Sequence, residues 1–201
     1  MGQLILLRHG ETEWSLAGRH TGRTDIPLTP RGEAAAAALA PVLARRRIAA
    51  AFTSPAQRAV RTAELAGLPG AKPDPDLWEW DYGGYEGRTT PEIQAIHPGW
   101  YLWRDGVIPG DAAHPGETVA QVGARTDAVL SRVRPLLAES GGDVALVAHG
   151  HVLRVLTARW LGLEAAAGRL FGLDTGTYCT LGTEHGVPVI STWNVRPADL
   201  S

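Results

Sequence analysis

Two apolar segments that each run into a His-Gly pair constrain the fold of this chain more than any other feature. Residues 4–10 read LILLRHG, and residues 144–150 read VALVAHG. Continuous apolar runs of this length are typical of strands that are buried on both faces of a parallel sheet. Ligands of open parallel sheets bind beyond the carboxyl ends of the strands. We therefore expect His9 and His149 to lie at the same rim of one sheet.

Helices are predicted between the strands. The Thr-Pro pair at 29–30 is a helix start, and the helix continues through EAAAAALAPVLARR with an interruption at Pro41. A strand over residues 48–54 follows, and we expect Ser54 to cap the next helix in a capping box with Gln57. The later elements expected are a short helix from a cap at Thr90, an amphipathic helix from Thr118, a strand at 143–150, a helix at 151–163 and a hairpin at 177–192.

This order of elements predicts a three-layer α/β/α sandwich around a mostly parallel central sheet. We expect a single domain over residues 1–201. The segment from about residue 74 to 117 is rich in glycine, proline and aromatic residues. We expect it to form a small inserted lobe that serves as part of a substrate lid.

The composition is typical of a globular protein. Hydrophobic residues make up 44% of the chain and charged residues 20%, and the formal net charge is -2. This balance argues against binding to nucleic acid or to a membrane surface. The one cysteine, Cys179, cannot form an intrachain disulfide, and no leader or membrane-spanning run is recognisable. We expect a cytoplasmic protein.

The residues expected at the rim of the sheet suit an anion. Arg8 precedes His9 at the end of the first strand, and Arg58 lies in the first turn of the helix after Ser54. Free N–H groups at a helix start favour anions, and guanidinium groups suit phosphate oxygens. Two arginines beside two histidines would be strongly unfavourable if they were buried alone. A dianion such as a phosphomonoester would neutralise them.

Four motifs in this order resemble the histidine phosphatase (phosphoglycerate mutase-like) superfamily: LLRHGETEW, TGRTDIPLTPRGEAAA, SPAQRAVRTAE and VAHGHVLR. The resemblance extends from residue 4 to about residue 163 and implies that His9 is a nucleophile that forms a phosphohistidine. The residues implied to hold the phosphoryl group are Arg8, Arg58 and His149. The further substrate-binding residues are Ser15, Thr21 and Gly22, to which we add Gly150 at the rim.

Glu79 is the general acid that the resemblance implies, because it lies in the segment LWEWDYG, ahead of an aromatic-glycine pair. If this segment is extended, Trp78 and Trp80 point away from Glu79 but wall its surroundings. Such apolar walls, together with a phosphate dianion, would favour the protonated carboxyl group. Gly150 after His149 excludes the second branch of the superfamily, which has aspartate there. No metal or other cofactor is expected, since neither histidine has a carboxylate or cysteine at ligand spacing.

Three functions fit this resemblance: a phosphatase, a phosphoglycerate mutase and a non-catalytic phosphate-binding module. We expect the phosphatase, because mutases of this type have a longer insert with extra arginines and a tail that excludes water from the site. Here the insert over residues 91–117 contains one arginine, Arg104, and only NVRPADLS follows Trp193. The expected partner is a small phosphorylated metabolite. A homodimer is expected on the resemblance alone.

The substrate is left open between small phosphomonoesters in general and sugar bisphosphates. The segments WEWDYGGYEGRTTPEI and YLWRDG resemble a sedoheptulose-bisphosphatase-like subgroup. In this interpretation Arg104 contacts a second phosphate or a carboxylate, and Trp103 stacks on a sugar. The other histidines are expected outside the site: His151 as a helix-start residue, and His20, His97, His114 and His185 at the surface.

Overall fold

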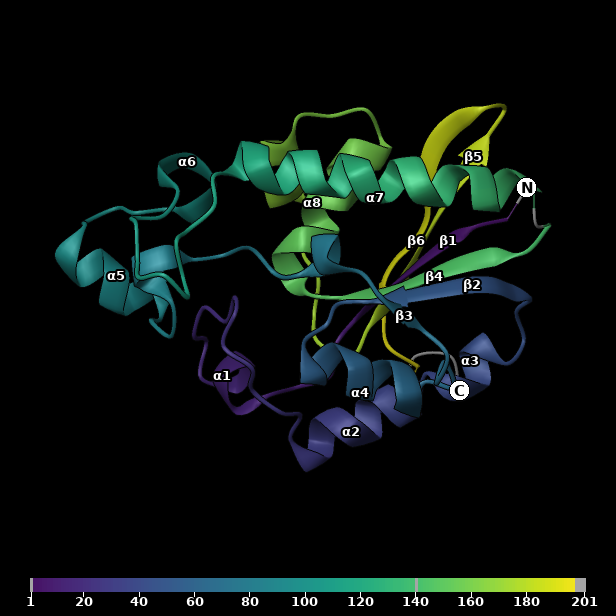
Figure 1. The fold of residues 1–201 in the computed structure, drawn as a ribbon, viewed down its shortest axis with the longest axis horizontal. Helices are drawn as coiled ribbons and strands as arrows, with labels where there is room; N and C mark the ends of the chain where they lie inside the picture. The colour runs from purple at the N-terminus through teal and green to yellow at the C-terminus, as the bar shows by residue number, and fades with distance from the viewer. Residues whose placement is uncertain (1, 140, 198–201) are drawn as a thin grey trace.

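The computed structural model describes residues 2–139 and 141–197. Within these residues, six strands form one sheet in the order β3-β2-β4-β1-β5-β6 (Figure 1). The strands are β1 (Leu4–Arg8), β2 (Ile48–Thr53), β3 (Lys72–Pro73), β4 (Asp143–Ala148), β5 (Tyr178–Glu184) and β6 (Val187–Val195). Strands β1 to β4 are parallel, whereas β5 and β6 are antiparallel to their neighbours. The predicted mostly parallel sheet is confirmed.

Helices cover both faces of the sheet (Figure 1). Those on one face are α7 (Val119–Glu139) and α8 (Gly150–Trp160), and those on the other are α2 (Pro30–Ala37), α3 (Ala40–Leu43) and α4 (Gln57–Leu65). Successive residues of β1 point to opposite faces, as a strand requires. Leu4 and Leu6 join the hydrophobic cluster of α7 and α8, while Ile5 and Leu7 join the cluster of α3 and α4. The chain is therefore the predicted three-layer sandwich.

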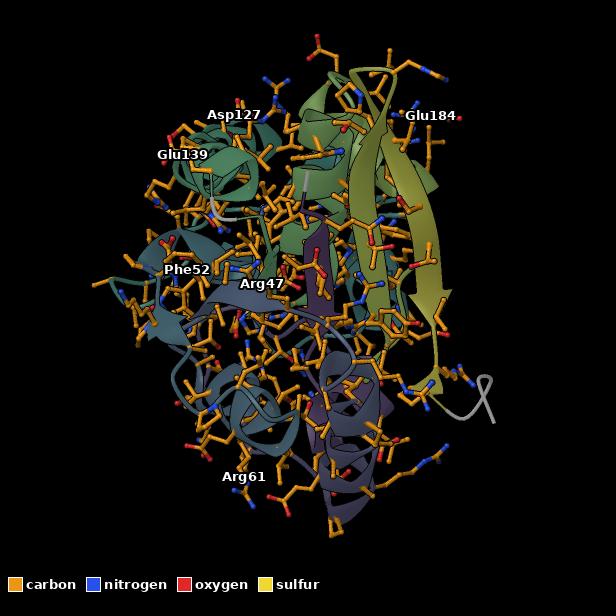
Figure 2. The ribbon with its side chains drawn as sticks, turned by 90° about the vertical axis from the view of Figure 1, so that its right-hand side faces the viewer. Arg47, Phe52, Arg61, Asp127, Glu139 and Glu184 are labelled. Atoms are coloured by element: carbon orange, nitrogen blue, oxygen red, sulfur yellow. The ribbon has the colours of Figure 1, made fainter. Side chains whose placement is uncertain are left out.

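Figure 2 shows the same layers from the side. Asp127 and Glu139, both on α7, lie on one side of the sheet, and Arg61 of α4 lies on the other and points away from it. Arg61 pairs with Glu33 and Glu64, so this arginine of the SPAQRAVRTAE motif is a surface ion-pair partner. None of the described helices is long and apolar enough to cross a membrane.

Residues 74–117 lie beyond the carboxyl ends of the parallel strands, where Figure 1 shows α5 and α6. The elements of this lobe are η1 (Pro75–Leu77), η2 (Gly83–Tyr85), α5 (Thr90–Ile96) and α6 (Leu102–Asp105). The lobe contacts the loop that follows β1: Arg19 pairs with Thr89 in an isolated bridge and donates from Nη1 to the Gly87 carbonyl at 2.6 Å. Its assignment as a lid within a single domain over residues 1–201 stays a prediction.

The start of α4 differs from the sequence prediction. The helix begins at Gln57 with Ala56 as its N-cap, and no side chain caps it. Ser54 is therefore not the cap, and the capping box predicted with Gln57 does not form. The Ser54 hydroxyl lies against the His149 ring instead. A tertiary contact has replaced the local one that the SPAQ pattern indicated.

The other helix boundaries lie closer to those predicted from the sequence. Thr89, rather than Thr90, caps α5, because Glu92 completes a capping box with Thr89. The helix predicted from residue 30 is interrupted between α2 and α3, as expected near Pro41. A short helix, α1 (Glu13–Leu16), runs into the segment predicted as a loop.

Two glycines allow the loop after β1 to pack directly on α2. A Cβ added to Gly10 would collide with the Gly32 carbonyl, and a Cβ added to Gly32 would collide with the Glu11 carbonyl. Thr29, the cap of α2, accepts from the Gly32 N–H and donates to the Glu11 carboxylate. This close backbone contact fixes the loop that carries His9.

Candidate active site

His9 lies directly after β1, and its backbone N–H donates to the Ala148 carbonyl at the end of β4 at 2.9 Å. The side chain is buried, and its Nδ1 lies 2.7 Å from the Gly10 carbonyl oxygen. A carbonyl oxygen can only accept, so Nδ1 carries the proton and donates it. The other ring nitrogen, Nε2, is left with its lone pair available as a nucleophile.

His149 follows β4 and lies beside His9, with 5.1 Å between the ring centroids. Parallel pairing of β1 with β4 sets this distance, because Arg8 is the register partner of Ala148. Arg58 completes the group: it is fully buried on α4 and donates from Nε to His149 Nδ1 at 3.1 Å. The structure thus brings together the two histidines and Arg58, which are far apart in the sequence.

Carbonyl groups of the loop before α2 surround the Arg58 guanidinium. Its Nη1 donates to the Thr24 carbonyl, and its Nη2 donates to the Gly22 carbonyl, both at 2.9 Å. The Thr21 carbonyl accepts a longer bond from Nη2 at 3.4 Å. The Gly22 N–H is bound by the Glu86 carboxylate at 2.9 Å. Gly22 therefore holds Arg58 in place through its carbonyl, while its amide is bound by Glu86; its contact with phosphate stays a prediction.

Arg8 lies at the same rim and has an unused hydrogen-bond donor in its guanidinium group. Its Nη1 donates to the Leu173 carbonyl, while its Nε is buried and has no hydrogen-bond partner among the described residues. Gly150 at the start of α8 makes room for this side chain, because a Cβ there would lie 3.1 Å from Arg8 Cζ. A buried guanidinium N–H without a partner is unfavourable. An oxygen atom of a bound anion would satisfy it.

Both rim histidines are neutral around neutral pH. Burial lowers the pKa of His9 well below its usual value, and the charges of Arg58 and Arg8 lower it further. Burial, then Arg58, does the same to the pKa of His149. A nucleophilic imidazole must be unprotonated, so the surroundings of His9 keep it in the reactive form.

Glu79 lies in the same pocket and is held by the start of α8. Its carboxylate accepts from the backbone N–H groups of Trp80, His151 and Val152 at 2.9 to 3.0 Å. These three bonds fix the position of the carboxylate at the start of α8. The effect expected of apolar walls around Glu79 stays a prediction. Trp80 is buried against Trp103, with 5.5 Å between the ring centroids.

A cavity of about 210 Å³ opens at the rim. The predicted site residues that line it are Arg8, His9, Ser15, Thr21, Glu79 and Gly150. Arg58 and His149 have no exposed surface and lie behind His9 rather than on the cavity wall. The additional residues that line it are Gly18, Arg19, His20, Tyr82, His151 and Arg154.

Two histidines expected outside the site lie on this wall. His151 accepts or donates a 2.6 Å hydrogen bond between its Nδ1 and the Tyr82 hydroxyl. The His20 ring lies 4.8 Å from the Tyr82 ring, and burial lowers the pKa of His20 to about 4. His20 is half-buried and lines the cavity from the loop after β1. A signal for His151 and Arg154 was present in the sequence, because helical spacing after Gly150 puts both near one face of α8.

The structure does not bring Arg104 to this cavity. Its Nε and Nη2 bind the Asp105 carboxylate at 2.8 and 2.7 Å, and it borders a separate hollow of about 370 Å³. Trp103 lines that second hollow too and is buried, with the Arg154 guanidinium 4.8 Å from its ring centroid. Neither Arg104 nor Trp103 lines the cavity beside His9, and their contacts with substrate stay a prediction. Trp103 packs against two residues of the cavity wall, Arg154 and His151, and the His151 ring centroid lies 5.4 Å from its own.

Comparison with known proteins points to one family. The sequence pattern of the histidine phosphatase superfamily (branch 1) matches residues 4–196. The chain is 41% identical over 187 residues to an acid phosphatase of Mycobacterium tuberculosis, covering 92% of this chain and 88% of the relative. It is 36% identical over 188 residues to sedoheptulose 1,7-bisphosphatase of Saccharomyces cerevisiae, covering 79% and 67%. A solved mycobacterial glucosyl-3-phosphoglycerate phosphatase superposes with a TM-score of 0.83 at 29% identity, over 97% of this chain and 100% of that one.

The buried neutral histidines predict how stability depends on pH. The pKa values of His9, His20, His149 and His151 are lowered in the folded protein, whereas the unfolded chain titrates near 6.5. Below about pH 6.5 the unfolded state therefore binds more protons, and the free energy of unfolding falls as the pH drops. Urea unfolding between pH 7.5 and 5.5 measures this slope. The variant His20→Gln should reduce the slope by about half a proton at pH 6.5 and by close to one proton at about pH 5.5. An unchanged slope would contradict the neutral assignment.

Proposed function

This chain belongs to the histidine phosphatase superfamily (branch 1) and is a phosphatase, and we propose that it hydrolyses small phosphomonoesters through a phosphohistidine on His9. One observation carries the assignment of the nucleophile. His9 is buried and neutral, presents an unprotonated Nε2, and lies next to an Arg8 Nε that lacks a partner. A nucleophile beside an unsatisfied cationic donor is what attack on a phosphoryl group requires.

The charge of the cavity supports a dianionic substrate. Three arginines and one carboxylate line it, namely Arg8, Arg19, Arg154 and Glu79. Its histidines are neutral near neutral pH, since their pKa values are lowered by burial first. The three arginines outnumber the one carboxylate, so the lining is net positive whether Glu79 is ionised or protonated. A phosphomonoester carries between one and a half and two negative charges at about pH 7, which suits such a lining.

In the first step His9 Nε2 attacks phosphorus, a P–N bond forms and the ester P–O bond breaks. Arg8 supplies two donors, Nε and Nη2, to the oxygens of the phosphoryl group, and the nearby charge of Arg58 stabilises the transition state. His149 holds Arg58 in place. Glu79 gives a proton to the leaving oxygen. A dianion beside the Glu79 carboxylate favours the proton uptake that this step needs.

In the second step a water molecule attacks the phosphohistidine. Glu79, now ionised, takes the proton from this water as the P–N bond breaks and its electron pair returns to His9 Nε2. Inorganic phosphate leaves, and the proton on Glu79 is ready for the next substrate. The N–H groups at the start of α8 support this role, because they hold the carboxylate in place within the cavity.

A second anionic group on the substrate has a matching partner in Arg154. Its Nε and Nη2 donate to the carbonyls of Gly168 and Arg169, both at 3.1 Å, and Trp103 covers its plane. No hydrogen bond from its Nη1 is formed among the described residues, and Arg154 lines the cavity. Two relatives are named for substrates with two anionic groups, sedoheptulose 1,7-bisphosphate and glucosyl-3-phosphoglycerate. We propose that sugar phosphates with a second anion are preferred.

The setting of this reaction is also part of the proposal. The single cysteine, Cys179, is buried and free, which is consistent with the reducing cytoplasm. A homodimer is proposed from the family resemblance only. A small phosphorylated metabolite is the partner that the cavity fits.

Replacing Glu79 tests the assignment of acid and base. In Glu79→Gln, kcat for a sugar phosphate should fall by about 10²-fold or more, because an alkoxide leaving group needs a proton. The first step with an aryl phosphate, measured as a pre-steady-state burst, should fall much less. Glu64→Gln, a change at a surface carboxylate, is the control. Unchanged sugar-phosphate turnover in Glu79→Gln would remove this role.

A separate assay distinguishes the phosphatase from the mutase. The wild-type protein given 3-phosphoglycerate with a bisphosphoglycerate primer should release phosphate, and formation of the 2-isomer would favour the mutase.

Replacing Arg154 tests the second anion. Arg154→Gln should raise KM for a sugar bisphosphate by about 10-fold or more, since a charged hydrogen bond is lost. KM for a simple aryl phosphate should stay within twofold. The matched control is Arg104→Gln, which removes the arginine that borders the other hollow and should change neither value. Equal loss on both substrates in Arg154→Gln would count against a second-anion contact.

A further inference from the structure

The Ser54 hydroxyl serves the active site rather than the helix that follows it. Ser54 comes directly after β2, and its backbone N–H donates to the Val147 carbonyl of β4 at 2.8 Å. Its Oγ lies 2.7 Å from His149 Nε2 and 3.3 Å from the Ala56 N–H. Both Ser54 and His149 have no exposed surface. A hydrogen bond in such a dry site has no water to replace it.

The direction of this hydrogen bond follows from its neighbour. The Arg58 Nε always carries a proton and can only donate, so His149 Nδ1, at 3.1 Å from it, must be the acceptor. A neutral imidazole with a bare Nδ1 carries its proton on Nε2. Nε2 therefore donates and Ser54 Oγ accepts. This fixes the tautomer of His149 from two sides.

A continuous chain of hydrogen bonds results, from Arg58 Nε through the His149 ring to Ser54 Oγ. The Ala56 N–H, which also donates to Ser54 Oγ, holds the hydroxyl in this orientation. At the other end, the Thr24 and Gly22 carbonyls bind the remaining arms of Arg58. Among the described residues, the two hydrogen bonds of the His149 ring therefore join it to Arg58 and Ser54.

We propose that Ser54 is a positioning residue of the phosphatase reaction: it accepts the Nε2 proton of His149 and so keeps Nδ1 directed at Arg58. This inference rests on the proposed function, in which the charge of Arg58 stabilises the transferring phosphoryl group. Without Ser54 Oγ, the buried Nε2–H of His149 has no acceptor, which favours rotation of the imidazole ring away from its present orientation. Arg58 then loses the acceptor that fixes its Nε beside His9.

The test compares Ser54→Ala with Thr53→Val. Thr53 is the matched control, because it is the adjacent buried hydroxyl and donates only to the Ser54 carbonyl, at 3.1 Å. Both variants should lose stability, so both are assayed at a temperature where unfolding curves show them folded. Ser54→Cys keeps the size of the side chain with a weaker acceptor. We expect kcat/KM to fall by about 10- to 100-fold in Ser54→Ala, as for lost outer-shell partners of metal-bound histidines, to fall less in Ser54→Cys, and to stay within twofold in Thr53→Val.

Proton NMR of the imidazole N–H region gives a second readout that does not depend on turnover. A buried, hydrogen-bonded Nε2–H of His149 should give a slowly exchanging signal, assigned by its loss in His149→Gln. The signal should disappear or shift in Ser54→Ala and stay in place in Thr53→Val. An unchanged signal in Ser54→Ala would overturn the inference, as would wild-type kcat/KM in Ser54→Ala or an equal loss in Thr53→Val.

The two proposals fail in different ways. If His9→Ala retained turnover, the proposed mechanism would be wrong whatever Ser54→Ala does. If His9→Ala were inactive while Ser54→Ala kept full kcat/KM, the mechanism would stand and the role of Ser54 would be wrong.

Discussion

The parallel pairing of β1 with β4 is the constraint on which the site depends. Their register opposes Arg8 to Ala148, so the next residue of each strand is a histidine at the same rim. A shift of one residue would turn every strand side chain to the other face and separate the two rings. The close packing of Gly10 on Gly32 then holds the His9 loop against α2. Strand pairing and backbone contact thus position the nucleophile before any substrate binds.

Arginine side chains concentrate positive charge at this rim, while the two rim histidines stay neutral. Arg58 is buried among carbonyl oxygens of the Thr21–Thr24 loop, which offset its desolvation. Its charge, after burial itself, lowers the pKa values of His9 and His149, so both rings stay neutral. Glu79 is the one carboxylate on the described cavity wall, and the start of α8 holds it. The arrangement combines a neutral nucleophile, a cationic surrounding and one proton carrier.

Sequence patterns predicted the framework because its determinants are local. The apolar runs of β1 and β4, each followed by a His-Gly pair, predicted that His9 and His149 lie in one site. The motif around Glu79 predicted a third residue of that site. Tertiary packing decided the rest. Whether Arg104 or Arg154 faces the cavity depends on how the irregular 97–117 segment folds against η3 (Ala165–Leu170), where Trp103 packs on Gly168. The local sequence predicted Ser54 as a helix cap, because its actual partner, His149, lies 95 residues away and no local pattern reports that contact.

The central claim is that His9 carries the phosphoryl group between the two steps. Rapid acid-free quenching of the enzyme with a ³²P-labelled phosphomonoester, followed by peptide mapping, tests it most directly. The label should be stable in alkali, labile in acid and located on the peptide that contains His9, and His9→Ala should trap none. A label on any other residue, or full turnover by His9→Ala without a labelled protein, would contradict it.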